Sequence, residues 1–295
     1  MTHQITSENV DSYRKCLLRE EYAESTVRKY VGDIRAFCVW LERFGAEESG
    51  QGASGSGFFG IDRETAARWK SYLVEEGYAS VTVNAMLSSL NSFFRFMGWE
   101  ECRVKFLKIQ RKMFRDQDRE LSRSEYGRLQ ETARAFGNVR LALLLETICA
   151  TGMRVSEVKY ITVENIGRRR ADISLKGKIR TILLPGKLCK KLRDYARQRK
   201  ISSGQIFVTK RENGMSRGQI WREMKRLCGK AGVSPSKVFP HNLRHLFART
   251  FYKVCRDIAG LADVLGHSSI ETTRIYLIST GENHALQMEK LGLVS

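Results

Sequence analysis

Two long segments near the N-terminus carry apolar residues at helical spacing, and this pattern constrains the fold more than any other feature. Segments 25–45 and 80–99 place an apolar residue every three to four positions. Each predicted helix therefore has one apolar face to bury against another element. A third helical pattern covers 62–77, so we predict a small all-helical domain for residues 1–106. The apolar positions are Val27, Tyr30, Val31, Ile34, Phe37, Cys38, Leu41, Val83, Met86, Leu87, Leu90, Phe93, Phe94 and Met97.

Two polar segments interrupt the helical patterns. Residues 45–60 contain six glycines and three serines, which is typical of a loop. Residues 107–118 are charged and lack a clear period, and we interpret them as an interdomain linker. The second predicted domain, 119–295, opens with Ser122 and Glu125 at the spacing of a capping box.

The hydrophobic period changes once within the second domain. Segment 139–152 is nearly all apolar, which indicates a buried helix. In 171–185, ADISLKGKIRTILLP, two short β-prone runs flank KGKIR and indicate a hairpin or small sheet edge. Helical patterns then resume, apart from QIFVTK. We therefore predict a mainly α fold with a small β-sheet: an all-helical N-terminal domain and a mixed, mostly helical second domain.

The net charge predicts the kind of partner. The chain carries 51 basic and 32 acidic residues, a net charge of +19. Such an excess favours polyanionic partners, of which nucleic acid is the commonest. A basic membrane-surface protein is the alternative, but the basic clusters are spread along the chain at 103–115, 166–170, 187–200 and 225–232. No apolar run approaches the roughly 18 residues of a membrane span, and the N-terminus does not read as a secretory signal.

The cysteines and acidic residues indicate no metal or disulfide framework. Seven widely spaced cysteines contain no C-x-x-C pair, which favours free thiols in a reducing cytosol. No acidic cluster suited to a divalent cation is evident. We therefore expect neither a cofactor nor a metal.

Several residues suited to chemistry on a phosphodiester recur in the second domain. Arg154 follows Gly152 at the end of the apolar segment, and Tyr276 lies nine residues after His267. Each has an ordinary alternative: a local ion pair, a helix cap, a corner histidine or a packed tyrosine. The other members are His241 and Arg244, three apart on one predicted helix, and Lys176 and Lys178 on the hairpin.

Taken together, these residue types match one reaction. A tyrosine that attacks a DNA phosphate builds negative charge on phosphorus, and arginine forks donate paired hydrogen bonds to phosphate oxygens. Tyrosine, with a reference pKa of about 10, needs a base and positive charge for activation. The leaving 5′-oxygen needs a proton, which a lysine on a hairpin can supply.

These motifs resemble the tyrosine recombinase (phage-type integrase) family. ATGMRVSEV is similar to the family's first arginine box; HNLRHLFAR, LGH and the tyrosine nine residues later are similar to its second. The resemblance covers about 119–280, and the helical N-terminal part resembles the family's core-binding domain. The length resembles the compact Xer-like subgroup.

The resemblance implies a role for each residue. Arg154 and Arg244 would clamp the scissile phosphate, and Tyr276 would form a 3′-phosphotyrosyl bond and release a 5′-hydroxyl. His241 would be the general base or proton relay, and His267 would hydrogen-bond the phosphate.

The same resemblance assigns the general acid to Lys176. The family's hairpin usually reads G-K-G-x-K-x-R, whereas LKGKIR is one residue shorter, so Lys178 is a rival. Glu157 matches an acidic residue that braces the arginine and histidine.

The resemblance also implies the partners. The family acts without ATP or metal, as a homotetramer on two paired DNA sites. Each chain would clamp around duplex DNA. The expected location is the cytoplasm of bacteria, at the nucleoid. Accessory proteins are possible partners. A tail after Tyr276 would dock into a neighbouring subunit; the alternative is a tail folded on its own domain.

Two further hypotheses stay open. A type IB topoisomerase would use the same chemistry to nick and reseal one duplex. A non-catalytic DNA-binding regulator would keep only the fold, and the presence of Arg154, Arg244 and Tyr276 argues against it.

Overall fold

The computed structural model describes residues 2–48, 60–109, 119–175, 178–274 and 276. The chain divides into two compact units, Met1–Arg111 and Lys112–Ser295. The linker predicted at 107–118 stays a prediction, because 110–118 lie outside the described residues. The tail after Tyr276 and the hairpin residues 176–177 also lie outside them.

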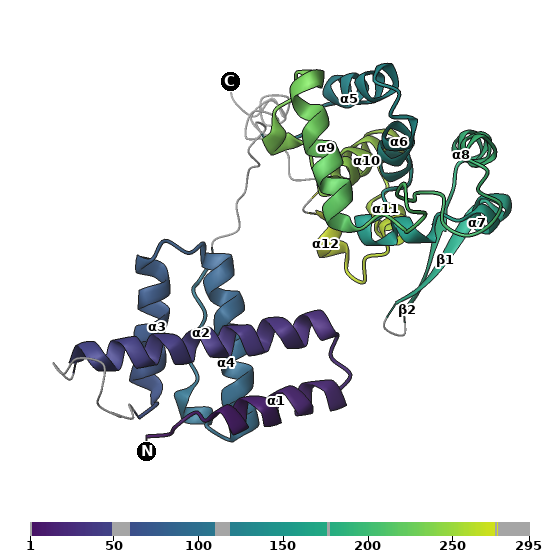
Figure 1. The fold of residues 1–295 in the computed structure, drawn as a ribbon. Helices are drawn as coiled ribbons and strands as arrows, with labels where there is room; N and C mark the ends of the chain where they lie inside the picture. Colours follow the sequence, from purple (N-terminus) through teal and green to yellow (C-terminus); the bar gives the residue numbers. More distant parts are fainter. Residues whose placement is uncertain (1, 49–59, 110–118, 176–177, 275, 277–295) are drawn as a thin grey trace, which may run out of the picture. The chain divides into compact units, whose positions relative to one another are not determined.

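The first unit consists of two crossed pairs of helices. Helices α1 and α2 lie side by side and run across α3 and α4 (Figure 1). The apolar faces predicted from the sequence meet in one core, where Ile34, Phe37, Phe93 and Phe94 are fully buried. The bounds are α1 (Ser7–Arg19), α2 (Glu24–Glu48), α3 (Arg63–Glu75), α4 (Ser80–Met97) and a 3₁₀ turn η1 (Glu100–Cys102).

The predicted loop at 45–60 begins later than the sequence indicates. Helix α2 continues to Glu48, because alanine and two glutamates at 46–48 are good helix formers. Residues 49–59 lie outside the described part of the chain.

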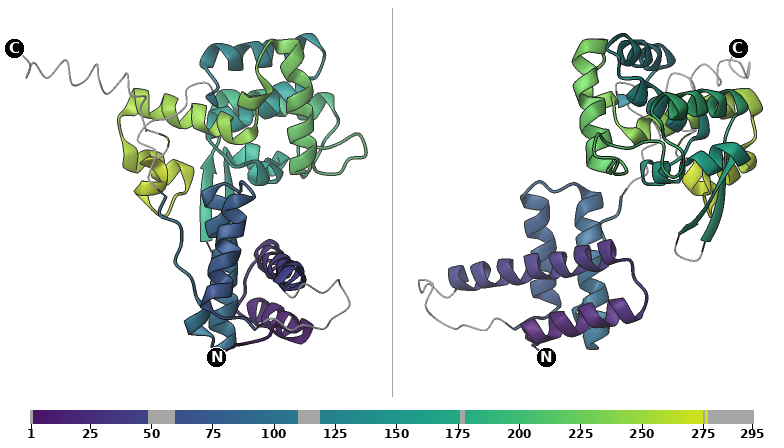
Figure 2. Two further views of the ribbon diagram at one scale, coloured as in Figure 1. Left: turned by 90° about the vertical axis from the view of Figure 1, so that its left-hand side faces the viewer. Right: turned by 45° about the vertical axis from the view of Figure 1, so that its right-hand side comes forward.

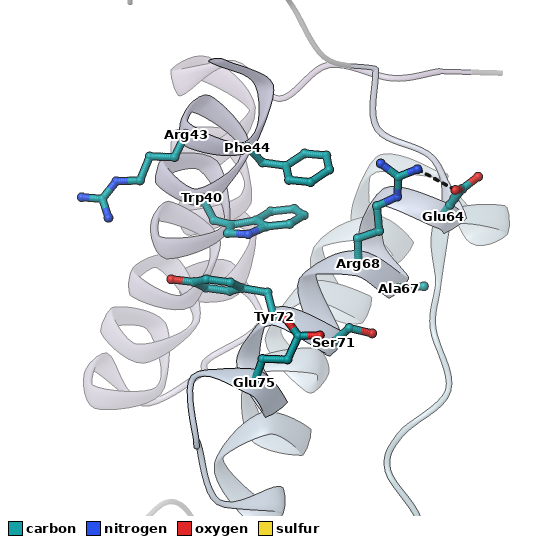
Figure 3. Close-up of a pocket in the computed structure, with 9 residues that line it drawn as sticks. All are labelled: Trp40, Arg43, Phe44, Glu64, Ala67, Arg68, Ser71, Tyr72 and Glu75. Carbon is teal, nitrogen blue, oxygen red and sulfur yellow. Dashed lines mark hydrogen bonds and ion pairs between the residues drawn. The ribbon is translucent and has the colours of Figure 1, made fainter. Parts of the chain in front are cut away.

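A hollow on the first unit lies between α2 and α3. Aromatic rings of Trp40, Phe44 and Tyr72 line it, beside an ion pair between Arg68 and Glu64 at 2.8 Å (Figure 3). The rings of Trp40 and Phe44 stack with centroids 5.0 Å apart. This hollow is part of the aromatic packing that joins the two helices.

The second unit is built around α6, which is buried along most of its length. Helix α10 packs against α6, and α5 packs against both α6 and α9. The capping box predicted from Ser122 and Glu125 is present at the start of α5. The bounds are α5 (Arg123–Ala135), α6 (Val139–Thr151), η3 (Val155–Tyr160), α7 (Val163–Arg168), α8 (Gly186–Gln198), α9 (Arg217–Ala231), η4 (Pro235–Lys237), α10 (Pro240–Cys255), α11 (Ile258–Leu265) and α12 (Ile270–Arg274).

The hairpin predicted around KGKIR is an antiparallel pair of strands. Strands β1 (Arg170–Leu175) and β2 (Lys178–Leu183) pair in a register that sets Ile173 opposite Arg180 and Leu175 opposite Lys178. The hairpin extends away from the helices of its unit in both views of Figure 2. The predicted fold class, mainly helical with one small sheet, is confirmed.

None of the helices in the described part of the chain combines the length and the apolar composition that a membrane crossing requires.

Candidate active site

The turn after α6 positions Arg154. Gly152 caps α6 in the left-handed conformation, with φ of 62°, and a Cβ at this position would collide with the ring of Phe247. Glycine is therefore required for both the turn and the close packing. Two residues later, the side chain of Arg154 remains 44% exposed, which leaves its guanidinium accessible to a ligand.

Glu157 is a buried carboxylate shared by two arginines. Its side chain is 2% exposed and accepts hydrogen bonds from Arg154 at 3.1 Å and from Arg180 at 2.7 and 2.8 Å. Arg180, from β2, also donates to the carbonyl of Val264 at 2.9 Å. A buried carboxylate needs such partners, because desolvation of an unpaired charge is costly. Glu157 thus joins the turn after α6 to the hairpin, and Arg180 joins the hairpin to the end of α11.

Arg244 lies beneath the site on α10. It is only 2% exposed, and its Nη1 donates to the carbonyl of Gly152 at 2.5 Å. Its Nη2 donates to the carbonyl of Leu265 and contacts Nε2 of His267, both at 2.8 Å. Burial lowers the pKa of Arg244, and the nearby hydroxyl of Tyr276 only partly offsets that shift.

His267 lies at the corner between α11 and α12. Its Nδ1 is 2.8 Å from Oγ1 of Thr273, a fully buried residue of α12. Burial and then the positive charges of Arg244, Arg154 and Arg180 lower the pKa of His267 to about 4. The imidazole is therefore neutral near neutral pH.

Tyr276 packs among three histidine rings. It is 3% exposed, and its ring stacks on His267 with centroids 5.6 Å apart and planes 11° apart. The ring of His245 meets it edge-on at 4.4 Å, and the ring of His241 is 6.0 Å away. The structure therefore brings together five of the six predicted site residues.

Lys176, the sixth predicted residue, lies outside the described residues. Its rival Lys178 is the first residue of β2, where it pairs with Leu175. The choice between the two lysines stays a prediction.

Three residues at the site were not singled out as candidates from the sequence: Arg180, His245 and Thr273. His245 lies four residues after His241 on α10, a spacing that places two side chains on one helix face. Arg180 ends the KGKIR segment. Nothing in the local sequence around Arg180 indicated that it would contact Glu157, 23 residues earlier.

The charges at the site favour an anion. Among the described residues, the guanidinium groups of Arg154 and Arg180 pair with the carboxylate of Glu157. Arg244 adds a third guanidinium, whose pKa is lowered by burial and by the nearby charges of the other two. The remaining positive charge sits beside the hydroxyl of Tyr276. Such an arrangement is suited to holding a phosphate against a tyrosine nucleophile.

A group with metal-ligand chemistry occurs elsewhere in the described residues, in the first unit. Ligand atoms of His3, Glu101 and Cys102 lie within 4.8 Å of one another. His3 already pairs with Glu101 at 2.6 Å, and the thiol of Cys102 donates to the carbonyl of Ile61. Burial raises the pKa of Cys102 to about 11, which keeps the thiol protonated. His3 and Glu101 therefore pair with each other, and Cys102 has a backbone partner.

Two segments of the chain match models of known protein families. Residues 119–282 match the phage integrase family, and residues 10–101 match the phage integrase N-terminal SAM-like domain. The chain belongs to the phage integrase family. The resemblance inferred from the motifs is therefore confirmed.

Relatives extend over almost the whole chain. Tyrosine recombinase XerA of Pyrococcus furiosus is 28% identical, with 98% of this chain and 96% of the relative covered. Tyrosine recombinase XerD of Vibrio vulnificus is 26% identical over 86% of this chain and 85% of the relative.

Solved structures share the fold. A lambda integrase dimer bound to a COC′ core site has a TM-score of 0.70 at 20% identity, covering 94% of this chain and 95% of that one. XerH bound to its difH substrate has a TM-score of 0.67 at 18% identity, covering 96% and 84%.

Proposed function

We propose that this protein is a site-specific DNA recombinase that cuts and rejoins duplex DNA through Tyr276. The observation that carries the proposal is the position of Tyr276, whose ring stacks on His267, the histidine that contacts Arg244 at 2.8 Å, in a site where Arg154 stays exposed. The nucleophile and its phosphate-binding groups thus occupy one site. Membership of the phage integrase family supports the same chemistry.

In the proposed reaction, the oxygen of Tyr276 attacks the scissile phosphate and the 5′-oxygen of the next nucleotide leaves. Arg154 and Arg244 stabilise the charge that develops on the non-bridging oxygens. The proton of the tyrosine passes to His241, and His245, whose ring lies nearer to Tyr276, is placed to assist. Lys176 protonates the leaving oxygen, with Lys178 as the alternative acid.

The phosphotyrosyl bond conserves the energy of the broken linkage. The free 5′-hydroxyl of a second duplex can attack it, and the strands rejoin without ATP. Each of the two duplexes is cleaved and rejoined on both strands, so the exchange requires four tyrosines. We propose that a homotetramer acts on two paired sites in the cytoplasm. A solved lambda integrase tetramer bound to a Holliday junction, of TM-score 0.68 to this chain, supports that assembly by its shared fold. Accessory proteins and the docked tail belong to this proposal.

Paired sites distinguish a recombinase from a topoisomerase. The site can be recovered by sequencing DNA that the wild-type protein traps covalently in cells. We expect a supercoiled plasmid with two such sites to give deletion or inversion products, and a plasmid without sites to stay supercoiled. Relaxation of the site-free plasmid would instead indicate a type IB topoisomerase, and the absence of any covalently trapped DNA would indicate a regulator.

DNA affinity is expected to fall steeply with salt. The net charge of +19 predicts many phosphate contacts, each of which releases bound counterions. For roughly six or more contacts, the affinity falls about 10³-fold or more between 50 and 200 mM salt. Fluorescence anisotropy with a labelled duplex measures the slope, and a flat response would contradict a phosphate-dominated interface.

A further inference from the structure

The hydrogen bonds around His267 determine which of its nitrogens carries a proton. Nη2 of Arg244 lies 2.8 Å from Nε2 of His267. A guanidinium has donors and no acceptor, so Nε2 must be the acceptor in this bond. The neutral ring then holds its proton on Nδ1, which donates to Oγ1 of Thr273 at 2.8 Å.

The opposite tautomer does not fit this site. A proton on Nε2 would face the N–H groups of Arg244. The hydroxyl of Thr273 can accept or donate, so Arg244 selects the tautomer and Thr273 supplies the acceptor for the resulting Nδ1–H. Thr273 is fully buried on α12, three residues before Tyr276, and the backbone N–H of Tyr276 donates to its carbonyl at 3.0 Å. One residue therefore contacts both the histidine ring and the segment that bears the nucleophile.

We propose that Thr273 is a positioning residue: its hydroxyl accepts the Nδ1–H of His267 and holds the orientation of the ring that Arg244 binds through Nε2. The proposal rests on the proposed recombinase function and deepens it. In the free protein, the Nε2 lone pair is held toward Arg244, which also binds the carbonyls of Gly152 and Leu265.

The bond from Nδ1 of His267 to Thr273 also holds the ring in place when a phosphate enters the site. To donate to a phosphate oxygen, His267 must gain a proton from solvent at Nε2 and become an imidazolium. Burial and the neighbouring charges of Arg244, Arg154, Arg180 and His241 oppose that protonation in the free protein. An incoming phosphate offsets those charges. Nδ1 is a donor in both states, so the ring keeps its bond to Thr273 and need not rotate.

The matched variants are Thr273→Val, Thr273→Ser and Thr272→Val. Valine has nearly the shape of threonine but lacks the acceptor, whereas serine keeps the hydroxyl. Thr272 is the exposed neighbour of Thr273 on the same helix, so Thr272→Val controls for the same chemical change without the bond to His267.

The first readout is the tautomer itself. The chain has five histidines, so ¹⁵N-histidine labelling of the full-length protein gives few ring signals, and His267→Gln assigns the one of interest. We expect the Nδ1–H form in the wild type, Thr273→Ser and Thr272→Val. In Thr273→Val the Nδ1–H loses its acceptor, so we expect the ring signals of His267 to shift away from those of the wild type. An Nε2–H form in the wild type overturns the proposal even if Thr273→Val fails to fold.

The second readout is the rate of single-turnover cleavage of a nicked suicide duplex carrying the recovered site. Groups that orient a metal-bound histidine by bonding its second ring nitrogen typically contribute roughly 10- to 100-fold to affinity or activity, and we expect the same scale for this ring. We expect a loss of that size for Thr273→Val, and rates near the wild type for Thr273→Ser and Thr272→Val. Wild-type cleavage by Thr273→Val overturns the proposal, and so do ring signals of His267 that are unchanged from the wild type. If the wild type cleaves no DNA while its Nδ1–H form is present, the recombinase function fails and the tautomer assignment stands.

Discussion

Tyr276→Phe protein is expected to form no covalent adduct with a nicked suicide duplex on which the wild type accumulates one. The substitution removes the attacking oxygen and keeps the ring that packs on His267 and His245. DNA affinity should stay within about twofold, because binding depends on phosphate contacts made elsewhere. Denaturing gels measure the adduct, and mobility shifts measure binding.

The control for this substitution is Tyr195→Phe. Tyr195 is a buried tyrosine of α8 that is 5% exposed and packs in the core of the second unit, in a different hydrophobic cluster from Tyr276, so loss of its hydroxyl should leave the adduct unchanged. Thermal unfolding checks that Tyr276→Phe is folded, since loss of the polar contacts of a buried hydroxyl costs roughly 1 kcal/mol. An adduct that persists in Tyr276→Phe would assign the nucleophile to another residue.

Local signals predicted the helices well. The stripes in α2 and α4 specify buried faces, and Ser122 with Glu125 marks the start of α5, because apolar spacing and capping involve residues three or four positions apart. The hairpin was predicted for the same reason, from β-prone runs on either side of a short turn.

The arrangement of the site depends on contacts that no local pattern contains. Arg244 bonds the carbonyl of Gly152, 92 positions earlier, and Arg180 meets Glu157 across the turn after α6. Family motifs named most of the residues but not these pairings. The partner of Arg244 is a backbone carbonyl, which leaves no trace in the sequence, and Arg180 and Glu157 are too far apart in the sequence for a local pattern to pair them. The tautomer of His267 likewise follows only from the donors around it.

The second large effect concerns the general acid. Lys176→Ala is expected to cleave normal DNA roughly 10²- to 10⁴-fold more slowly than the wild type, because an unprotonated alkoxide leaves poorly. Replacing the bridging 5′-oxygen by sulfur gives a thiolate, which leaves without a proton. The variant should therefore recover most of its rate on the sulfur-bridged duplex, as followed by single-turnover cleavage on denaturing gels.

Two variants show whether this rescue is specific. Arg154→Ala should lose roughly 10²- to 10³-fold and should not be rescued, because an exposed guanidinium paired with Glu157 acts on the non-bridging oxygens, which sulfur does not change. Lys178→Ala should be mild on both substrates, since Lys176 opens the family-like KG of the hairpin. The reverse pattern would move the role to Lys178, at the first position of β2, and rescue of neither lysine variant would place the acid outside the hairpin.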